Sequence, residues 1–171
     1  MRAPGFTHVK KEIRVLGLAT GKADTHHVIG VVYRGRLYLD GVMRTRSQGP
    51  DLTDDVIEMV TGSSHHPQIR VILIGSKQIG AGARIDPGRL SEEIGKPVIT
   101  MGLKTGEKFN HQPTQTFEMK KGREKIAISS FNLKKDVSEK ILHYSSYSDG
   151  EPEVLRIADL LTSSVTNRKT T

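Results

Sequence analysis

The feature that most constrains the fold is a series of apolar runs that are too continuous for strands on a protein surface. The first run, IRVLGLA at 13–19, lies between charged residues and Gly21. The run at 68–75, QIRVILIG, has the same character, and KPVITM follows at 96–101. Such runs are typical of strands covered on both faces, whereas half-exposed strands alternate apolar with polar residues. The chain therefore predicts a sheet with packing on both sides.

Two further β-rich segments, at 28–33 and 37–43, come soon after the first run. Only the short sequence Arg34-Gly35-Arg36 separates them, and a glycine between two such segments is typical of a hairpin. We therefore expect the first three strands to be antiparallel.

Two helices are predicted between the later runs. Over 52–60 apolar residues recur at helical spacing, and Asp51 or Thr53 can cap the start. Over 86–95 a capping Asp86 precedes a proline at the first helical position, and a glycine ends the segment. Strands that helices separate in this way are usually parallel.

The predicted order is three strands, helix, strand, helix, strand, which is that of a ribonuclease H-like mixed sheet. We expect an α/β fold with three antiparallel strands, then parallel strands, and helices on both faces. Few apolar residues fall within 102–125, so we expect a loop there, whereas 131–147 and a segment that Pro152 opens are predicted helices. Residues 1–171 are expected to form one domain with a short flexible N-terminus and a basic tail at 166–171.

Composition limits the functions open to the chain. It has no cysteine, which excludes disulfides, thiolate metal sites and thiol nucleophiles. No run approaches the roughly 18 apolar residues of a membrane span, and MRAPGFTHVKKE lacks the apolar region of an export signal. We expect a cytoplasmic protein without membrane contact. The formal net charge of +7 favours a polyanionic partner such as nucleic acid.

Six segments, spread over nearly the whole chain, carry a resemblance to a known family. They are IRVLGLATG at 13–21, VIGVVYRGRLYLDGV at 28–42, DLTDDVIEMV at 51–60, QIRVILIG at 68–75, GKPVITM at 95–101 and EPEVLRIADLL at 151–161. Together they resemble the archaeal domain-of-unknown-function-99 family, whose members are similar to endonuclease V. The resemblance implies an endonuclease V-like domain over 1–171 and a role in DNA or RNA processing or repair.

The chain departs from that family where metal ligands are expected. Ribonuclease H-like nucleases hold divalent ions with carboxylates at the ends of neighbouring central strands. The family pattern has Gly-Ile-Asp-Asp-Gly after its first strand and Leu-Asp-Gly after its fourth. Here Ala19 and Thr20 replace the aspartate pair, Ile74 replaces the next aspartate, and the segment at 81–84 replaces a Phe-Asn region. We therefore expect no catalytic residue and no metal or other cofactor.

Other acids leave an alternative open, in which a two-metal site for Mg²⁺ or Mn²⁺ has been rebuilt elsewhere. Asp24 follows the first strand, Asp40 lies near the end of the third, and Asp86 stands at a helix start. Capping accounts for Asp86 without a metal, and turn formation accounts for the other two. The adjacent pairs His26-His27 and His65-His66 have poor ligand spacing, because neighbours on a strand point to opposite faces.

Basic residues indicate how nucleic acid would be held. The glycine-rich segment at 75–84 joins a strand to a helix, a position where backbone amides can bind phosphate. In the hairpin, two arginine pairs spaced by two residues each place both side chains on one face. The candidate nucleic-acid-binding residues are Arg34, Arg36, Arg44, Arg46, Lys77 and Arg84.

Three functional hypotheses follow. The leading one is a catalytically degenerate, endonuclease V-like protein that binds nucleic acid. The second is a divalent-metal-dependent endonuclease that acts on deaminated or structured DNA through Asp24, Asp40 or Asp86. The third is a non-catalytic subunit that binds a protein partner or a second copy of itself.

Overall fold

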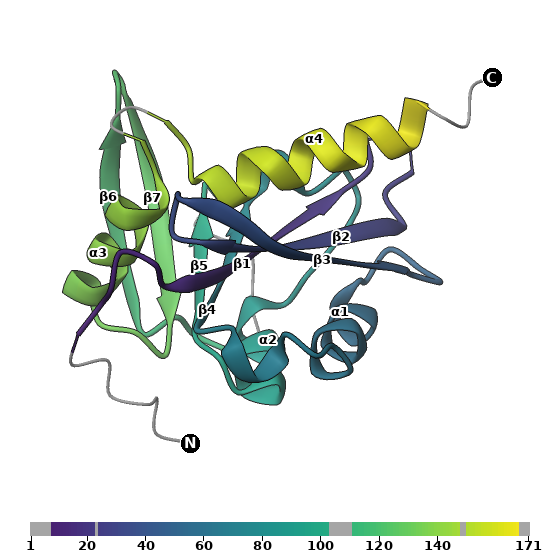
Figure 1. The fold of residues 1–171 in the computed structure, drawn as a ribbon, viewed down its shortest axis with the longest axis horizontal. Coiled ribbons are helices and arrows are strands. Elements are labelled where there is room, and N and C mark those ends of the chain that lie inside the picture. The colour runs from purple at the N-terminus through teal and green to yellow at the C-terminus, as the bar shows by residue number, and fades with distance from the viewer. Residues whose placement is uncertain (1–7, 23, 103–110, 148–149, 168–171) are drawn as a thin grey trace.

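A computed structural model describes residues 8–22, 24–102, 111–147 and 150–167. For residues 165–167 it describes the backbone but not the side chains. Its centre is a seven-stranded sheet, shown in Figure 1. In spatial order the strands are β3 (Tyr38–Arg46), β2 (His27–Arg34), β1 (Arg14–Thr20), β4 (Val71–Gly75), β5 (Val98–Met101), β7 (Glu124–Phe131) and β6 (Gln115–Lys121).

The pairing of the strands confirms the predicted mixed sheet. β1 pairs antiparallel with β2 and β2 with β3, while β1, β4 and β5 are mutually parallel. The parallel strands therefore all end at one edge of the sheet, at Thr20, Gly75 and Met101. We call this the carboxyl edge.

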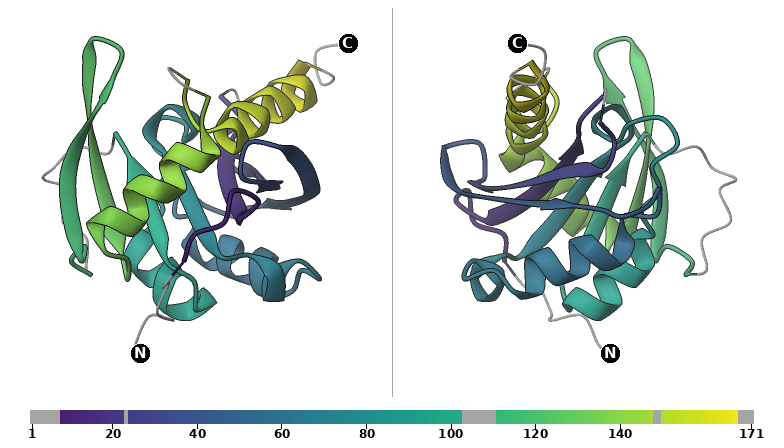
Figure 2. Two further views of the ribbon diagram at one scale, coloured as in Figure 1. Left: turned by 60° about the vertical axis from the view of Figure 1, so that its left-hand side comes forward. Right: turned by 90° about the vertical axis from the view of Figure 1, so that its right-hand side faces the viewer.

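Helices cover both faces of the sheet, as the sequence predicts. α1 (Thr53–Thr61) and α2 (Pro87–Ile94) lie on one face, and α3 (Lys135–Ser145) and α4 (Glu153–Asn167) lie on the other, as Figures 1 and 2 show. Two short 3₁₀ turns, His66–Gln68 and Ser76–Gln78, flank β4. Among the described residues, no helix is long and apolar enough to cross a membrane.

Alternate residues of the central strands supply two separate cores. On β1, Val15 and Ala19 pack into the core beneath α3 and α4, while Leu16 and Leu18 pack into the core beneath α1 and α2. Because both faces of the strand are buried, its apolar run is continuous. The approach of α4 is close enough that a Cβ added at Gly17 would lie 2.9 Å from Val154 Cγ2.

The helix signals of the sequence are confirmed at α2. The Asp86 side chain accepts a hydrogen bond from the Arg89 backbone N–H at 3.1 Å, Pro87 is the first helical residue, and Gly95 follows the helix with a left-handed φ of 76°. At α1 the helix starts at Thr53, and Asp51 accepts a hydrogen bond from its backbone N–H. Both helix starts are therefore held by carboxylates.

The loop predicted over 102–125 is wrong in its second half, where β6 and the start of β7 form a hairpin. Residues 103–110 lie outside the described part of the chain. β6 is only half covered, so its polar residues alternate with Phe117 and Met119, and a count of apolar residues misses it. β7 also extends to Phe131, so the helix predicted from that residue begins later, at Lys135.

The hairpin of β2 and β3 turns at Gly35, whose φ is 56°. The pairing then shifts by one residue, from Tyr33 opposite Leu39 to Val32 opposite Gly41. Asp40 is therefore a β-bulge residue without a partner in the ladder. Most of the expected flexible N-terminus, at 1–7, and the end of the expected basic tail, at 168–171, lie outside the described residues.

A candidate nucleic-acid interface at the carboxyl edge

Internal contacts occupy the strand ends where the resemblance places carboxylates. Thr20 is 1% exposed, and its Oγ1 accepts a hydrogen bond from the Gly80 backbone N–H at 2.7 Å. Ala19 and Ile74 are buried in the two cores. These side chains offer one hydroxyl oxygen and two hydrocarbon groups, which do not fit the oxygen-rich ligand set that Mg²⁺ requires.

The end of β4 is closed by a buried amide. A Cβ added at Gly75 would lie 2.1 Å from Gln78 Oε1, so only glycine leaves room for this side chain. Gln78 Nε2 donates a hydrogen bond to Glu151 Oε2 at 3.1 Å, which ties the loop after β4 to the segment before α4. Gln78 is 4% exposed, and this bond satisfies one of its amide hydrogens.

A pocket of about 560 Å³ opens beside this closure, between the carboxyl edge and the β6–β7 hairpin. Its polar walls come from Lys77 and Gln78 after β4, from Glu151 before α4, and from the hairpin. Three lysines and two glutamates are among its lining residues: Lys77, Lys121, Lys125, Glu124 and Glu151.

Charges of both signs act on Lys121 in this pocket. Burial lowers the pKa of Lys121, and the positive charge of Lys77 lowers it further, while Glu151 and Glu124 oppose the shift. An anion that entered the pocket would stabilise the charged form of this lysine. With three lysines and two glutamates, the lining carries a small excess of positive charge.

The three acids of the alternative metal site are not brought together. Asp24 binds Arg46 at 2.8 Å and accepts a hydrogen bond from the His26 backbone N–H at 3.2 Å. Asp40 lies far from it along the hairpin, since Asp24 precedes β2 whereas Asp40 is near the β2–β3 turn. Within the described part of the chain, no group of three His, Asp or Glu side chains is arranged to hold a metal ion.

Asp40 lies between two arginines. Its carboxylate accepts hydrogen bonds from Arg14 Nε at 2.9 Å and Arg34 Nε at 3.3 Å. The bond from Arg14 is the main reason that the pKa of Asp40 is lowered, and the charge of Arg34 adds to the effect. This side chain therefore joins the first three strands.

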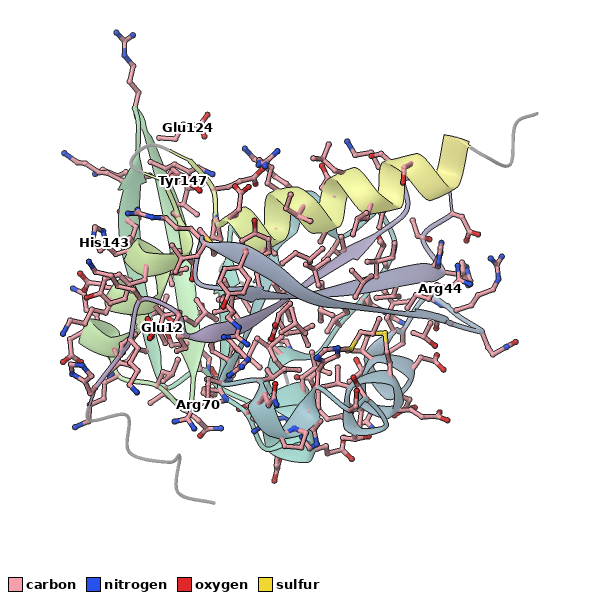
Figure 3. All side chains as sticks on the ribbon, in the orientation of Figure 1. Glu12, Arg44, Arg70, Glu124, His143 and Tyr147 are labelled. Atoms are coloured by element: carbon pink, nitrogen blue, oxygen red, sulfur yellow. The ribbon has the colours of Figure 1, made fainter. Side chains whose placement is uncertain are left out.

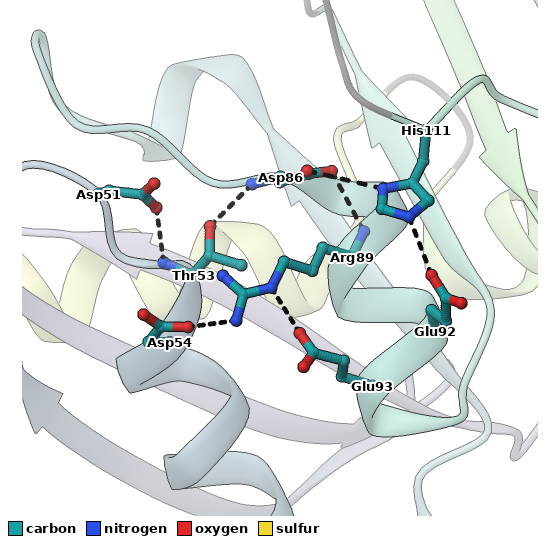
Figure 4. Close-up of polar contacts among 8 residues, drawn as sticks. All are labelled: Asp51, Thr53, Asp54, Asp86, Arg89, Glu92, Glu93 and His111. Atoms are coloured by element: carbon teal, nitrogen blue, oxygen red, sulfur yellow. Dashed lines mark hydrogen bonds and ion pairs between the residues drawn. The ribbon is translucent and has the colours of Figure 1, made fainter.

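Asp86 belongs to a network between α1 and α2, which Figure 4 shows. Its backbone N–H donates to Thr53 Oγ1 at 3.0 Å, in addition to its capping of α2. Arg89 binds Asp54 and, at 2.6 Å, Glu93. His111 Nε2 lies 2.9 Å from Oε2 of Glu92, a residue of α2. These contacts account for Asp86 as a structural residue.

The predicted arginines separate into two locations. Arg34 pairs with Tyr38 at the closed end of the β2–β3 hairpin, and Arg44 and Arg46 pair with Ile29 and His27 at the open end. Arg44 lies six positions after Tyr38 along β3, which corresponds to about 20 Å. The four arginines therefore do not form a single row.

Most of these arginines already have partners within the chain. Arg34 stacks on Tyr38, with its guanidinium carbon 5.1 Å from the ring centre, in addition to its contact with Asp40. Arg36 donates to the Ser146 carbonyl at 2.8 Å and lies 5.3 Å from the Tyr147 ring. Figure 3 shows Tyr147 near the β6–β7 hairpin and Arg44 at the other end of the molecule.

Four members of the predicted set are exposed: Arg44, Arg46, Lys77 and Arg84. The backbone of Arg84 forms a bridge with the Asp51 region, donating to Pro50 O and accepting from Leu52 N, both at 2.8 Å. The histidine pairs also have structural contacts, since His26 Nδ1 lies 3.2 Å from Ser47 O and His66 Nε2 lies 2.9 Å from Ile94 O.

Two features of this edge were missed by reasoning from the sequence. One is the pair Gln78 and Glu151, which are 73 positions apart and carry no local signal. The other is the hairpin that carries the basic residues of 120–125, which a glycine between two alternating segments at 116–121 and 124–128 could have revealed.

The strand order and the form of the carboxyl edge define a protein with an endonuclease V-like fold. Human ENDOV superposes with a TM-score of 0.66 at 12% identity, covering 98% of this chain and 89% of that one. Endonuclease V of Ciona intestinalis, in complex with a 23mer DNA containing an inosine followed by a ribo-adenosine, superposes with a TM-score of 0.65 at 12% identity. The match covers 100% of this chain and 92% of that one. A protein of unknown function from Archaeoglobus fulgidus superposes with a TM-score of 0.70 at 24% identity, covering 89% of this chain and 97% of that one.

The chain belongs to the Endonuclease dU family, whose profile matches residues 11–110. It is 30% identical to the UPF0215 protein of Methanothermobacter thermautotrophicus, over 97% of this chain and 94% of that protein. The UPF0215 protein of Methanopyrus kandleri is also 30% identical, over 92% and 93%. These relatives confirm the resemblance to an archaeal, endonuclease V-like family that the sequence predicts.

Proposed function

We propose that this chain is a single-domain, cytoplasmic nucleic-acid-binding protein that has kept the endonuclease V-like scaffold and lost metal-dependent cleavage. It would act in DNA or RNA processing or repair, by presenting nucleic acid to another protein. The observation that carries the proposal is the carboxyl edge, where Thr20 bonds to Gly80 and Ile74 is buried in the core. The residues at these strand ends do not supply the carboxylates that the chemistry needs.

The electrostatics of the same edge support binding. The chain has seven more basic than acidic residues, and three of its lysines line the pocket beside the closed strand ends. We assign phosphate contacts to Arg44, Lys77 and Arg84, whose side chains are exposed. Phosphate could also bind the guanidinium N–H groups that are not bonded within the chain at Arg34, Arg36 and Arg46.

A metal-dependent endonuclease remains the second candidate, because of the family name and because Glu124 and Glu151 both line the pocket. If these glutamates held the ion, cleavage would depend on Glu151 and be unaffected by Asp86→Asn. The name of the family suggests a deoxyuridine in DNA as the substrate to test first.

A salt titration of binding tests both candidates. Labelled single-stranded DNA, duplex DNA, duplex DNA with one deoxyuridine and matched RNAs are titrated with Mg²⁺ or Mn²⁺ present, so that any cut product is detected in the same samples. Binding that weakens with salt, without product, is expected. Product that disappears in Glu151→Gln would establish the endonuclease instead. No binding to any probe would contradict both and favour a protein-interaction subunit.

A further inference from the structure

The β6–β7 hairpin ends in a two-stranded ribbon, residues 118–127, that extends beyond the rest of the sheet (Figures 1 and 2). Met101, the last residue of β5, is opposite Ile128, and the chain turns between Lys121 and Glu124. The four residues from Ala127 to Glu124 therefore continue past β5 by about 14 Å. Along this length no other strand pairs with the ribbon among the described residues, and the Gly102 backbone N–H donates to the Ala127 carbonyl at 2.8 Å.

The charges of the ribbon are arranged unfavourably for an isolated protein. Lys120 lies directly opposite Lys125, both side chains are exposed, and Arg123 is exposed in the turn. Within the described part of the chain, none of these three cations makes a hydrogen bond or an ion pair. Lys121 differs, because it lies opposite Glu124. Like charges directly opposite each other destabilise a strand pair, so an external anion would stabilise this arrangement.

The composition of the ribbon indicates which polyanion it suits. Single-stranded nucleic acid is held largely by stacking on aromatic rings, and residues 118–127 contain no aromatic side chain. The major groove of B-form DNA is about 12 Å wide and 8.5 Å deep and admits a two-stranded ribbon. The major groove of A-form RNA is too narrow for this.

We propose that the ribbon enters the major groove of duplex DNA, with Lys120 and Lys125 on the phosphates beside the groove and Arg123 leading into it. This inference rests on the proposed function and specifies its substrate as B-form duplex. The ribbon then also sets the position of the DNA over the carboxyl edge, since it lines the pocket there from Ala127 to Glu124 and at Lys121.

The test uses the variant Lys120→Thr/Lys125→Thr, which removes the opposed charges and keeps residues that favour strands. Thermal melting of this variant is expected to be unchanged or raised, so weaker binding cannot be attributed to unfolding. Affinity for a 20-base-pair DNA duplex is expected to fall on the order of tenfold or more at 0.1 M salt, and the salt dependence to lose about two phosphate contacts. The matched control is Lys134→Gln/Lys140→Gln, which changes the net charge equally at exposed positions around α3.

Groove-blocking ligands complete the test. Methyl green, which occupies the major groove, is expected to weaken binding of the unaltered protein and to remove its advantage over the ribbon variant. Netropsin, a minor-groove ligand, is expected to have no such effect. Equal affinity of the ribbon and control variants, or equal affinity of the unaltered protein for RNA and DNA duplexes, would overturn the inference and leave the proposed function standing. Absence of binding by the unaltered protein would instead reject the proposed function itself.

Discussion

The end of β1 and the tip of the β6–β7 ribbon lie at the same edge of the sheet, but they differ in the burial and bonding of their polar groups. At the end of β1, Thr20 is buried and its hydroxyl is satisfied by the Gly80 backbone. At the ribbon, Lys120 and Lys125 are exposed and face each other. The hydroxyl of the first region is bonded within the chain, whereas the two lysines of the second have no hydrogen bond or ion pair among the described residues. The carboxyl edge therefore combines a strand end that is hydrogen-bonded internally with a ribbon whose basic side chains are exposed.

The comparison is tested most severely by placing the same acid in both regions. Ile74→Asp is expected to lower the free energy of unfolding by about 4 kcal/mol, because it removes a buried side chain and buries a carboxylate. Lys120→Asp is expected to raise it by about 0.5 kcal/mol, because the new carboxylate faces Lys125. Urea denaturation measures both. A stable Ile74→Asp protein that binds Mg²⁺ would show that the strand end still accepts a metal.

The closed strand end also depends on how α4 is seated. Gly17→Ala places a methyl group against Val154 and is expected to lower the free energy of unfolding by about 2 kcal/mol. Gly49→Ala is the control, since no atom lies within 4 Å of a Cβ added there. Equal stability of the two variants in thermal unfolding would mean that α4 can move away from β1 without cost.

A third region, Asp40 with Arg14 and Arg34, tests whether an acid offered as a metal ligand serves instead to stabilise the fold. The pKa of Asp40 is lowered in the folded state, so its ionised form stabilises the fold above the unfolded pKa near 3.9. Asp40→Asn is expected to cost about 1.5 kcal/mol at pH 7. The difference from the unaltered protein should shrink as the pH falls through the lowered pKa of Asp40. A difference that does not change with pH would contradict the assigned hydrogen bonds from Arg14 and Arg34.

The smallest expected effect concerns Asp86, which the sequence offered as a metal ligand. Asp86→Ala is expected to lower the free energy of unfolding by about 1 kcal/mol through loss of the α2 cap, whereas Asp86→Asn keeps a capping oxygen and should be nearly neutral. Chemical denaturation of the two variants gives the comparison. If Asp86→Asn instead abolished cleavage in the presence of Mn²⁺, the relocated metal site would be established.

The sequence predicts the buried part of this fold well, because burial on both faces leaves a strong signal. The runs that became β1 and β4 are continuous since each strand contributes to both cores. The start and end of α2 are also set locally. Asp86 caps the helix through Arg89, and Gly95 ends it with a bond to Ser91. Each of these features is determined by residues that lie next to one another along the chain.

The candidate site was less predictable, because its parts are distant in sequence. Nothing near Gln78 indicates that it will bind Glu151, and the identity of the lining residues depends on how the hairpin passes the end of β5. The β6–β7 hairpin itself was missed since half of its residues face solvent and are polar. The separation of the arginine pairs was not visible in the sequence for a related reason, because spacing along a strand does not give the position along the hairpin.

The bulge at Asp40 also affects how the molecule behaves at high concentration. β3 is an edge strand, and Leu37, Leu39 and Val42 beside or within it are about half exposed, which would invite another chain to extend the sheet. The bulge breaks the strand's register, so an incoming strand finds an uninterrupted row only from Gly41 to Arg46, and that row ends in two arginines. A single unpaired residue therefore gives this protein protection against aggregation along its most apolar edge.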